Sequence, residues 1–263
     1  MRVSGGLVAI VLALGGNLLA YDNSPASVLI FPEVIWAQAS GGGTWVSELQ
    51  ITNMTPNDAL HVRLCYGGGS YRTTTLTNSP AQYSSLKFSN ILATLQSMDT
   101  AFTYYGRVGC LIVDTYDAGH LIQGAVRTFN GNYSKNYQGL SGAPSNFIVL
   151  GRSMMIQNLT SNSTYRTSLS CFAWAGFQMT VEFALFDANG LMVGSPFFKT
   201  FVNSDFQSFN PFAETGAPYP AQSHDNCWLR ITPCYGDAYL FCFGSTANNY
   251  TNDPAAHIAM NYK

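Results

Sequence analysis

The most restrictive feature of the sequence is a series of short stretches in which apolar and polar residues alternate, each ended by a turn cluster. Trp45–Thr52 (WVSELQIT) and Leu60–Tyr66 (LHVRLCY) are clear examples. Side chains of a β-strand point alternately to its two faces, so this period of two predicts half-buried strands. The only helix expected beyond residue 28 is a short one around Asn90–Met98. Many short strands with frequent turns are typical of an all-β sandwich.

The strand pattern occurs twice along the chain. Thr164–Phe172 (TYRTSLSCF) corresponds to Thr44–Thr52 (TWVSELQIT), and Phe206–Pro211 corresponds to Ser85–Asn90. Near the end of each half, matching positions are separated by one constant spacing: Cys110 and Cys227, Gly119 and Gly236, Tyr133 and Tyr250. The pattern predicts a tandem duplication.

The duplication predicts two domains, residues 28–142 and 143–263, joined by the Gly/Ser/Pro-rich stretch 138–146. Each has about a hundred residues, the size of an immunoglobulin-like sandwich. Arg107–Asp114 and Leu121–Phe129 are expected to form a hairpin around the turn residues 117–119.

The first 27 residues predict export. Arg2 is followed by the apolar run Leu7–Leu14, and Ala20 offers a small residue for cleavage. The run is too short for a confident membrane span. We expect a cleaved signal peptide, with retention as an N-terminal anchor or assembly element as the alternative. After signal removal the chain is expected to be secreted, extracellular or on the cell surface, with no membrane span.

Six cysteines without a CxxC pair fit disulfides better than a metal site. The first half contains only Cys65 and Cys110, which we predict to be bonded. In the second half, a hairpin at residues 233–237 would place Cys227 opposite Cys242, leaving Cys171 for Cys234. The predicted disulfide cysteines are Cys65, Cys110, Cys171, Cys234, Cys227 and Cys242.

Several motifs resemble those of a secreted bacterial family of tandem immunoglobulin-like β-sandwich repeats of unknown function. They are Phe31-Pro32-Glu33-Val34 with Gly42–Asn53, Tyr165–Leu169, Phe183–Gly190, Gly194-Ser195-Pro196 and Asn252-Asp253-Pro254. The resemblance covers most of the chain beyond residue 28 and implies an extracellular sandwich tandem without catalytic residues to transfer. The sequence departs from the family pattern at Val46, where an arginine is expected, and in its extra cysteines.

The chain is poor in charge. Charged residues make up 10% of it, against roughly 25% in ordinary soluble domains, and the net charge is -2. A weakly self-repelling surface suits a protein that packs against its own copies; a monomer kept soluble by glycans is the alternative. Because no basic run occurs, nucleic acid is not expected as a partner.

A candidate assembly strand precedes the first domain. Its apolar residues could pair with the exposed edge of a neighbouring sandwich, or the segment could be the first strand of its own domain. The residues are Val28, Leu29, Ile30, Phe31, Val34, Ile35 and Trp36.

The sequence lacks the usual catalytic signatures. The four histidines, His61, His120, His224 and His257, lack the spacing of a metal site, and G-x-S-x-G, S-x-x-K and phosphate-loop motifs are missing. Asp114, Asp117 and Asp187 could form a glycosidase pair or hold calcium, but turn chemistry explains them more simply. We therefore expect no enzyme, no cofactor and no metal site.

Two surface features concern glycans. Sequons occur at Asn53, Asn132, Asn158, Asn162 and Asn249, which predicts exposed sites for glycosylation in a host with the transferase. Exposed tryptophans could stack on sugars, and the candidates are Trp36, Trp45, Trp174 and Trp228.

The sequence favours a non-catalytic structural protein, a subunit of a self-assembling filament, tube or surface layer. The alternative is a secreted adhesin module that binds carbohydrate or a cell surface.

Overall fold

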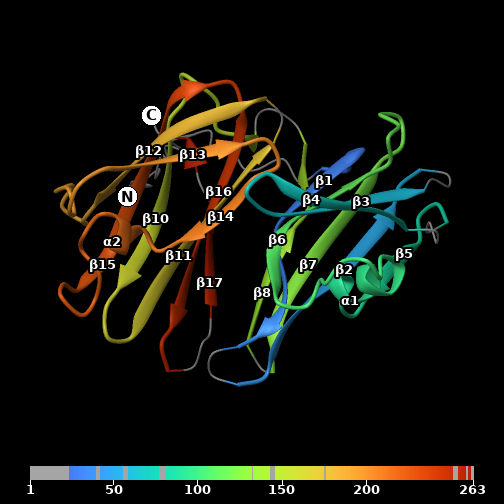
Figure 1. Ribbon diagram of the computed structural model, residues 1–263, viewed down its shortest axis with the longest axis horizontal. Coiled ribbons are helices and arrows are strands. Elements are labelled where there is room, and N and C mark those ends of the chain that lie inside the picture. Colours follow the sequence, from blue (N-terminus) through green and yellow to red (C-terminus); the bar gives the residue numbers. More distant parts are fainter. Residues whose placement is uncertain are drawn as a thin grey trace, which may run out of the picture.

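The alternating sequence stretches form antiparallel β-sheets in the computed structural model (Figure 1), so the all-β prediction is confirmed. The structure describes residues 24–39, 42–55, 59–76, 81–131, 133–142, 146–174, 176–250, 254–258 and 260–261. These residues contain eighteen strands and two short helices. Most of the expected signal segment lies outside the described residues.

The first half forms two sheets that face each other. Sheet I has the order β5-β2-β7-β8 and sheet II the order β4-β3-β6-β1-β9, and the end of β1 also pairs with β2. The elements are β1 (Val28–Gln38), β2 (Thr44–Asn53), β3 (Leu60–Gly67), β4 (Ser70–Leu76), β5 (Ser85–Phe88), α1 (Ile91–Met98), β6 (Arg107–Asp114), β7 (Ile122–Asn130), β8 (Tyr133–Gln138) and β9 (Leu140–Ser141). Asn90 caps the predicted helix α1 by accepting a hydrogen bond from the Ala93 N–H.

The second half repeats this arrangement strand for strand. Sheet III has the order β14-β11-β16-β17, and sheet IV has the order β13-β12-β15-β10-β18. The elements are β10 (Met154–Ser161), β11 (Tyr165–Trp174), β12 (Gln178–Phe186), β13 (Phe197–Val202), β14 (Phe206–Phe209), α2 (Pro211–Glu214), β15 (His224–Gly236), β16 (Tyr239–Asn248), β17 (Pro254–Ile258) and β18 (Met260–Asn261). Helix α2 lies at the same point of the order as α1 and is also capped by an asparagine, Asn210.

The candidate assembly strand is part of its own sandwich. β1 pairs with β6 from Val28 to Trp36, and its apolar side chains Leu29, Ile30, Phe31 and Val34 are buried. The alternative reading, a first strand of the same domain, is therefore the one the structure adopts. One edge of β1 is paired with β6 along its length, and the other is paired at Leu29 and Ile30 with β9 and at Ala37 and Gln38 with β2.

The predicted hairpin between residues 107–114 and 121–129 is also wrong. β6 pairs with β1 and β3 in sheet II, whereas β7 pairs with β2 and β8 in sheet I. The turn at residues 117–119 therefore connects two sheets. The same holds for β15 and β16 in the second half. β6 pairs with β1 and β3, and β15 pairs with β10 and β12. Both edges of each strand are therefore occupied by strands other than the one that follows it.

Strand pairing shows that the matching positions differ by one residue from the predicted alignment. Leu111 pairs with Leu64 in the first half, and Leu229 pairs with Leu185 in the second, all four on faces turned to their own cores. Leu111 therefore corresponds to Leu229. Cys110 and Cys227 are consequently not equivalent.

The core of the first half is shared with one face of the second half, which also has a core of its own. The core of the first half includes Phe172, Phe206, Phe241 and Phe243 from the outer face of sheet III. Trp174 also packs against it, and a Cβ on Gly142 would lie 3.0 Å from its ring. This burial of large aromatic side chains stabilises the docking of the halves.

Equivalent rows of paired residues on the outer faces of sheets III and I differ in polarity. In sheet III, Phe206, Phe172 and Phe241 lie side by side across three strands. In sheet I, the corresponding rung consists of Ser85, Thr52 and Gln123. The face that is buried between the halves is therefore aromatic, and the face of sheet I that ends the molecule is polar.

A glycine turn of the first half contacts the second half. Gly67, Gly68 and Gly69 all have positive φ, and the Gly69 N–H lies 3.4 Å from Oδ1 of Asp205. A Cβ on Gly69 would lie 2.9 Å from Cγ2 of Val202, whereas a Cβ on Gly68 would meet nothing within 4 Å. This glycine turn is therefore a contact between the halves.

This contact gives a matched pair of substitutions. Gly68→Ala is expected to cost about 1 kcal/mol, because alanine disfavours positive φ. Gly69→Ala adds the overlap with Val202 and should cost roughly 1 to 3 kcal/mol more. Urea denaturation of both variants checks this; equal losses of stability would contradict the contact.

Candidate functional site

A pocket of about 230 Å³ lies at the junction of the two halves. Strands β1, β2, β7 and β8 line it from the first half, and strands β11 and β16 line it from the second. Its charged, aromatic and hydroxyl-bearing side chains include Glu33, Trp45, Thr128, Lys135, Arg166 and Ser245. The pocket is complete only when the halves are docked.

Glu33 reaches the pocket because β1 is irregular at this point. The register with β6 shifts between Phe31 and Val34, and Pro32 lies inside the irregular stretch. Proline has no N–H to donate to a ladder, so it is found at such bulges. The bulge leaves Val34 in the core and Glu33 at the pocket.

Glu33 and Lys135 form an ion pair in which each side chain is only 11% exposed. A buried carboxylate needs such a partner, because an unpaired buried charge is very costly. Lys135 also lies 3.5 Å from Oγ of Ser245 in the second half, so the ion pair spans the junction. The Glu33 charge and burial raise the pKa of the neighbouring Tyr137 hydroxyl well above its ordinary value.

The rest of the pocket combines aromatic, hydroxyl and cationic groups. Trp45 pairs with Ala37 where β1 and β2 join. Thr128 lies behind it and shares a 2.7 Å hydrogen bond with Ser47. The Arg166 guanidinium donates to the Asn248 carbonyl at 3.4 Å and to Asn249 Oδ1 at 3.2 Å.

Of these residues only Trp45 was a candidate from the sequence. The others come from five strands of both halves, and no spacing in the sequence connects them. Of the other candidate tryptophans, Trp36 packs edge-on against Tyr105, Trp174 lies in the junction, and Trp228 stacks on Phe186 at 4.3 Å.

The four histidines lie apart and have local partners. His61 Nδ1 lies 3.1 Å from Thr75 Oγ1, and His224 Nε2 lies 3.0 Å from Gln222 Oε1. His257 Nε2 lies 3.1 Å from Thr246 Oγ1, and burial lowers its pKa. Within the described ranges, no group of three or more His, Cys, Asp or Glu side chains is placed to hold a metal ion.

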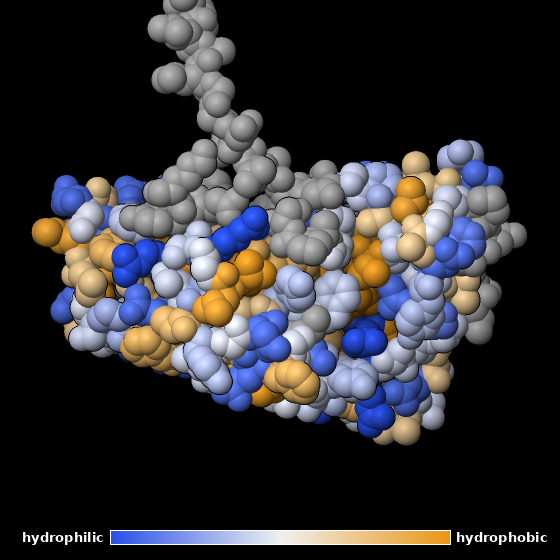
Figure 2. Space-filling view, turned by 90° about the horizontal axis from the view of Figure 1, so that it is seen from above, coloured by the Kyte–Doolittle hydropathy of each residue, from blue (hydrophilic) through white to orange (hydrophobic). Residues whose placement is uncertain are grey.

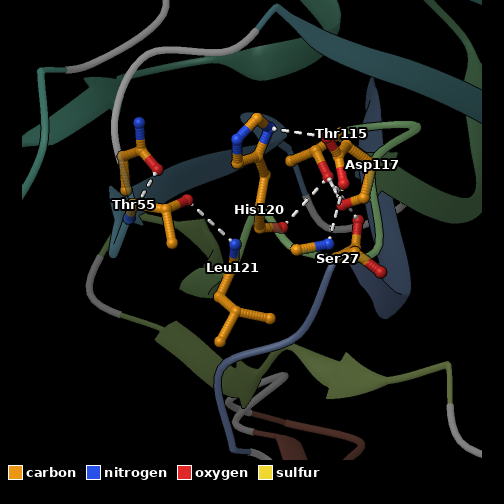
Figure 3. Close-up of polar contacts among 8 residues, drawn as sticks. Ser27, Thr55, Thr115, Asp117, His120 and Leu121 are labelled. Atoms are coloured by element: carbon orange, nitrogen blue, oxygen red, sulfur yellow. Dashed lines mark hydrogen bonds and ion pairs between the residues drawn. The ribbon is translucent and has the colours of Figure 1, made fainter.

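His120 belongs to a network that holds the connection between β6 and β7 (Figure 3). Thr115 Oγ1 lies within hydrogen-bond distance of the carbonyls of Asp117 and His120, at 2.9 and 3.0 Å. The Asp117 carboxylate accepts from the Gly119 N–H at 2.8 Å and pairs with His120 Nδ1 at 3.5 Å. Thr55 accepts from the Leu121 N–H at 3.0 Å. These bonds give Asp117 and His120 a structural role in the turn.

The other two aspartates also have local explanations. Asp187 accepts hydrogen bonds from the Asn189 and Leu191 N–H groups, both at 2.8 Å, as turn chemistry predicts. Asp114 lies directly opposite His61 in sheet II and is nearly buried. Burial raises its pKa above the ordinary value, although His61 and Arg63 act in the opposite direction.

The raised pKa of Asp114 predicts a pH dependence of stability. Because the folded protein holds this proton more tightly than the unfolded chain, the ionised carboxylate destabilises the fold as the pH rises above about 3.8. Asp114→Asn should therefore be more stable than wild type at pH 7, with a difference that shrinks toward pH 3. Urea unfolding at pH 3, 5 and 7 measures it. Glu48→Gln, which removes only a surface ion pair with Lys87, is the control; a less stable Asp114→Asn at pH 7 would contradict the prediction.

One disulfide joins neighbouring strands of sheet III. Cys171 on β11 faces Cys242 on β16, and the two are bonded. The predicted pairs Cys171–Cys234 and Cys227–Cys242 are wrong. β15 carries Cys227 and Cys234 in sheet IV, whereas Cys242 lies in sheet III, and both β15 cysteines are free.

Cys65 and Cys110 face each other on β3 and β6, as their predicted pairing requires, but both thiols are free. Burial raises the pKa of Cys65 to about 12 and that of Cys110 well above its ordinary value. The Cys65 thiol interacts with the Ser204 side chain of the second half. The predicted bridge is therefore wrong for this structure, in which both groups are buried, protonated thiols.

The predicted glycosylation sites differ in accessibility. Asn53 is buried, and its Oδ1 accepts a hydrogen bond from the Thr55 N–H. Asn162 and Asn249 are partly buried: the Asn249 side chain donates to the Asn162 carbonyl, and the Asn162 side chain donates to the Asp225 carboxylate. Asn158 is exposed. Asn132 lies outside the described residues.

Comparisons with known proteins give little. No protein-family model matches the chain, and no curated protein matches it. A solved structure of the infectious bursal disease virus VP2 subviral particle has 9% identity and a TM-score of 0.22, covering 92% of this chain and 73% of that chain. The structure of the infectious bursal disease virus Gx strain has 11% identity and a TM-score of 0.21, with 91% and 72% covered. In the described part of the chain no helix is long and apolar enough to cross a membrane. TM-scores this low carry no argument about fold or function.

Proposed function

We propose that this protein is an extracellular, non-catalytic structural protein that associates with copies of itself. The low charge, the disulfide and the aromatic packing between the halves support this role, because they describe a rigid body with a weakly repelling surface. The face seen in Figure 2 carries separate hydrophobic patches between hydrophilic residues. One sheet face carries the proposal.

That face is the outer side of sheet IV, here called the aromatic sheet face. It is defined by Phe186, Trp228, Phe198 and Tyr235. Phe186 and Trp228 stack across β12 and β15, Phe198 is 59% exposed, and Tyr235 is 71% exposed. Exposed aromatic side chains on a flat sheet are typical of protein–protein contact sites.

A second copy is the occupant that the fold supports. Sheet IV holds the same place in the second half as sheet II in the first, and sheet II is covered by sheet III of this chain. Glu182 and Arg230 form an ion pair at 3.2 Å within the aromatic sheet face. Side-by-side opposite charges can match those of a copy related by a two-fold axis.

Light scattering and sedimentation over a range of concentrations test the proposal. Wild type is expected to associate, and Phe198→Ser/Tyr235→Ser to shift the equilibrium to monomer. Tyr250→Ser is the matched control, because Tyr250 is 76% exposed but lies outside the aromatic sheet face. Monomeric wild type at every concentration would contradict self-association, and equal association of the double variant would exclude this face. Filaments, tubes or layers would be distinguished by negative-stain microscopy.

We further infer that the halves are immunoglobulin-like sandwich domains that arose by internal duplication, with residues 28–142 and 143–263 as the units. The identical strand order of the two halves supports the duplication. Two facing antiparallel sheets in each half support the sandwich class.

A second candidate function is binding of a surface glycan. One observation favours it: Trp45 lines a pocket together with charged and hydroxyl-bearing side chains. Aromatic rings pack on the C–H faces of sugars while polar groups bind the hydroxyls.

A further inference from the structure

The pocket at the junction has the dimensions of a site for one small ring. Its volume of about 230 Å³ is below the roughly 300 to 1,000 Å³ of sites for drug-sized ligands. Since strands of both halves form its walls, its shape depends on the same aromatic core that docks the halves. A pocket built this way is preformed, so a ligand does not have to order it.

The charges of the pocket sum to a positive value. Lys135 and Arg166 contribute +2 and Glu33 contributes −1, which leaves +1 among the lining residues. Lys135 and Glu33 are nearly buried, where water screens charge weakly. A site with this balance favours a ligand that carries one negative charge.

The position of Arg166 suits recognition of a carboxylate. Its guanidinium lies at the exposed rim and is oriented by its bonds to Asn248 and Asn249. A planar guanidinium matches the geometry of a carboxylate better than an ammonium does. Val46 occupies the equivalent strand position in the first half, so the first half has no counterpart of Arg166 at this position.

The uncharged lining suits the rest of a sugar. Trp45, Ile35 and Ala247 offer apolar contact, and Thr128, Ser168 and Ser245 offer hydroxyls. Glu33 is the one carboxylate of the described lining, whereas glycoside hydrolysis uses two. The arrangement therefore fits binding without turnover.

We propose that this pocket binds a carboxylate-bearing monosaccharide of the uronic acid class, with its ring against Trp45 and its carboxylate toward Arg166. The proposal rests on the second candidate function, glycan binding, and specifies the class of sugar. It is independent of self-association through the aromatic sheet face.

Titrations of the full chain with sodium glucuronate, glucose and sodium acetate, followed by NMR, test it. Saturable shifts of the Trp45 indole signal are expected with glucuronate. Glucose lacks the carboxylate and should bind about tenfold or more weakly, as for loss of a charge-assisted hydrogen bond. Acetate keeps the carboxylate but lacks the ring, so it should bind more weakly because it loses the contact with Trp45. Arg166→Gln should weaken glucuronate binding about tenfold. Arg152→Gln, at another exposed arginine of the second half, should leave it unchanged.

Each other result overturns part of the reasoning in a recognisable way. Glucose bound as tightly as glucuronate would overturn the anionic class and leave glycan binding standing. Acetate bound equally well would show a simple anion site and overturn the role of the sugar ring. Absence of binding by either sugar would overturn both the proposal and glycan binding at this site. Unchanged affinity in a folded Arg166→Gln variant would remove Arg166 from the site.

Discussion

Replacing both bonded cysteines, as Cys171→Ala/Cys242→Ala, is expected to lower the free energy of unfolding by about 4 kcal/mol. The bond closes a loop with a sequence separation of 71, and its removal gives the unfolded chain much more conformational freedom. Both residues are fully buried in the second-half core. Guanidinium denaturation followed by circular dichroism measures the loss.

The other cysteines provide the control for this experiment. Cys234 is free and exposed, so Cys234→Ala should change stability by less than about 0.5 kcal/mol. Peptide mapping of unreduced wild type should yield Cys171 and Cys242 in one linked fragment. A link from Cys171 to Cys234 would show that the strand pairing of sheet III is incorrect.

Phe243→Ala should cost about 3 to 5 kcal/mol, the range for truncating a fully buried phenylalanine. Phe243 is part of the first-half core although it belongs to the second half, and its ring meets Tyr137 edge-on at 5.6 Å. The substitution therefore leaves a cavity between the halves and weakens their docking. Denaturation followed by tryptophan fluorescence measures it, since each half contains two tryptophans.

Wild type should unfold in one transition, because the first-half core includes large side chains of the second half and neither half keeps its packing alone. Phe177→Ala, at a ring that is 86% exposed, is the control and should be nearly neutral. A loss below about 1 kcal/mol for Phe243→Ala, or two separate transitions in wild type, would contradict a shared core.

Local patterns in the sequence were sufficient to predict the strands. The strand expected over Arg107–Asp114 has the observed bounds of β6, and Asn90 marks the start of α1. The partners of each strand were not predictable in this way. A turn cluster such as residues 117–119 suits a hairpin and a connection between sheets equally well. The two are distinguished only by the pairing of β6 with β1 on one edge and with β3 on the other.

The cysteine pairing and the pocket were missed for related reasons. The pairing of Cys227 with Cys242 was predicted from a hairpin at residues 233–237, but β15 and β16 lie in different sheets and do not pair with each other. The pocket depends on how the halves dock, so Glu33, Lys135 and Arg166 carry no shared signal in the sequence. Trp45 was found only because tryptophans are few and each could be considered separately.

The contrast between the rung of Phe206, Phe172 and Phe241 and that of Ser85, Thr52 and Gln123 gives the molecule a direction. A gene in which the two coding segments were exchanged would place three phenylalanines at the water-facing end and bring serine, threonine and glutamine into the joint. A further duplicated domain would therefore find an aromatic surface to pack against at sheet IV, whereas the outer face of sheet I offers only a polar one.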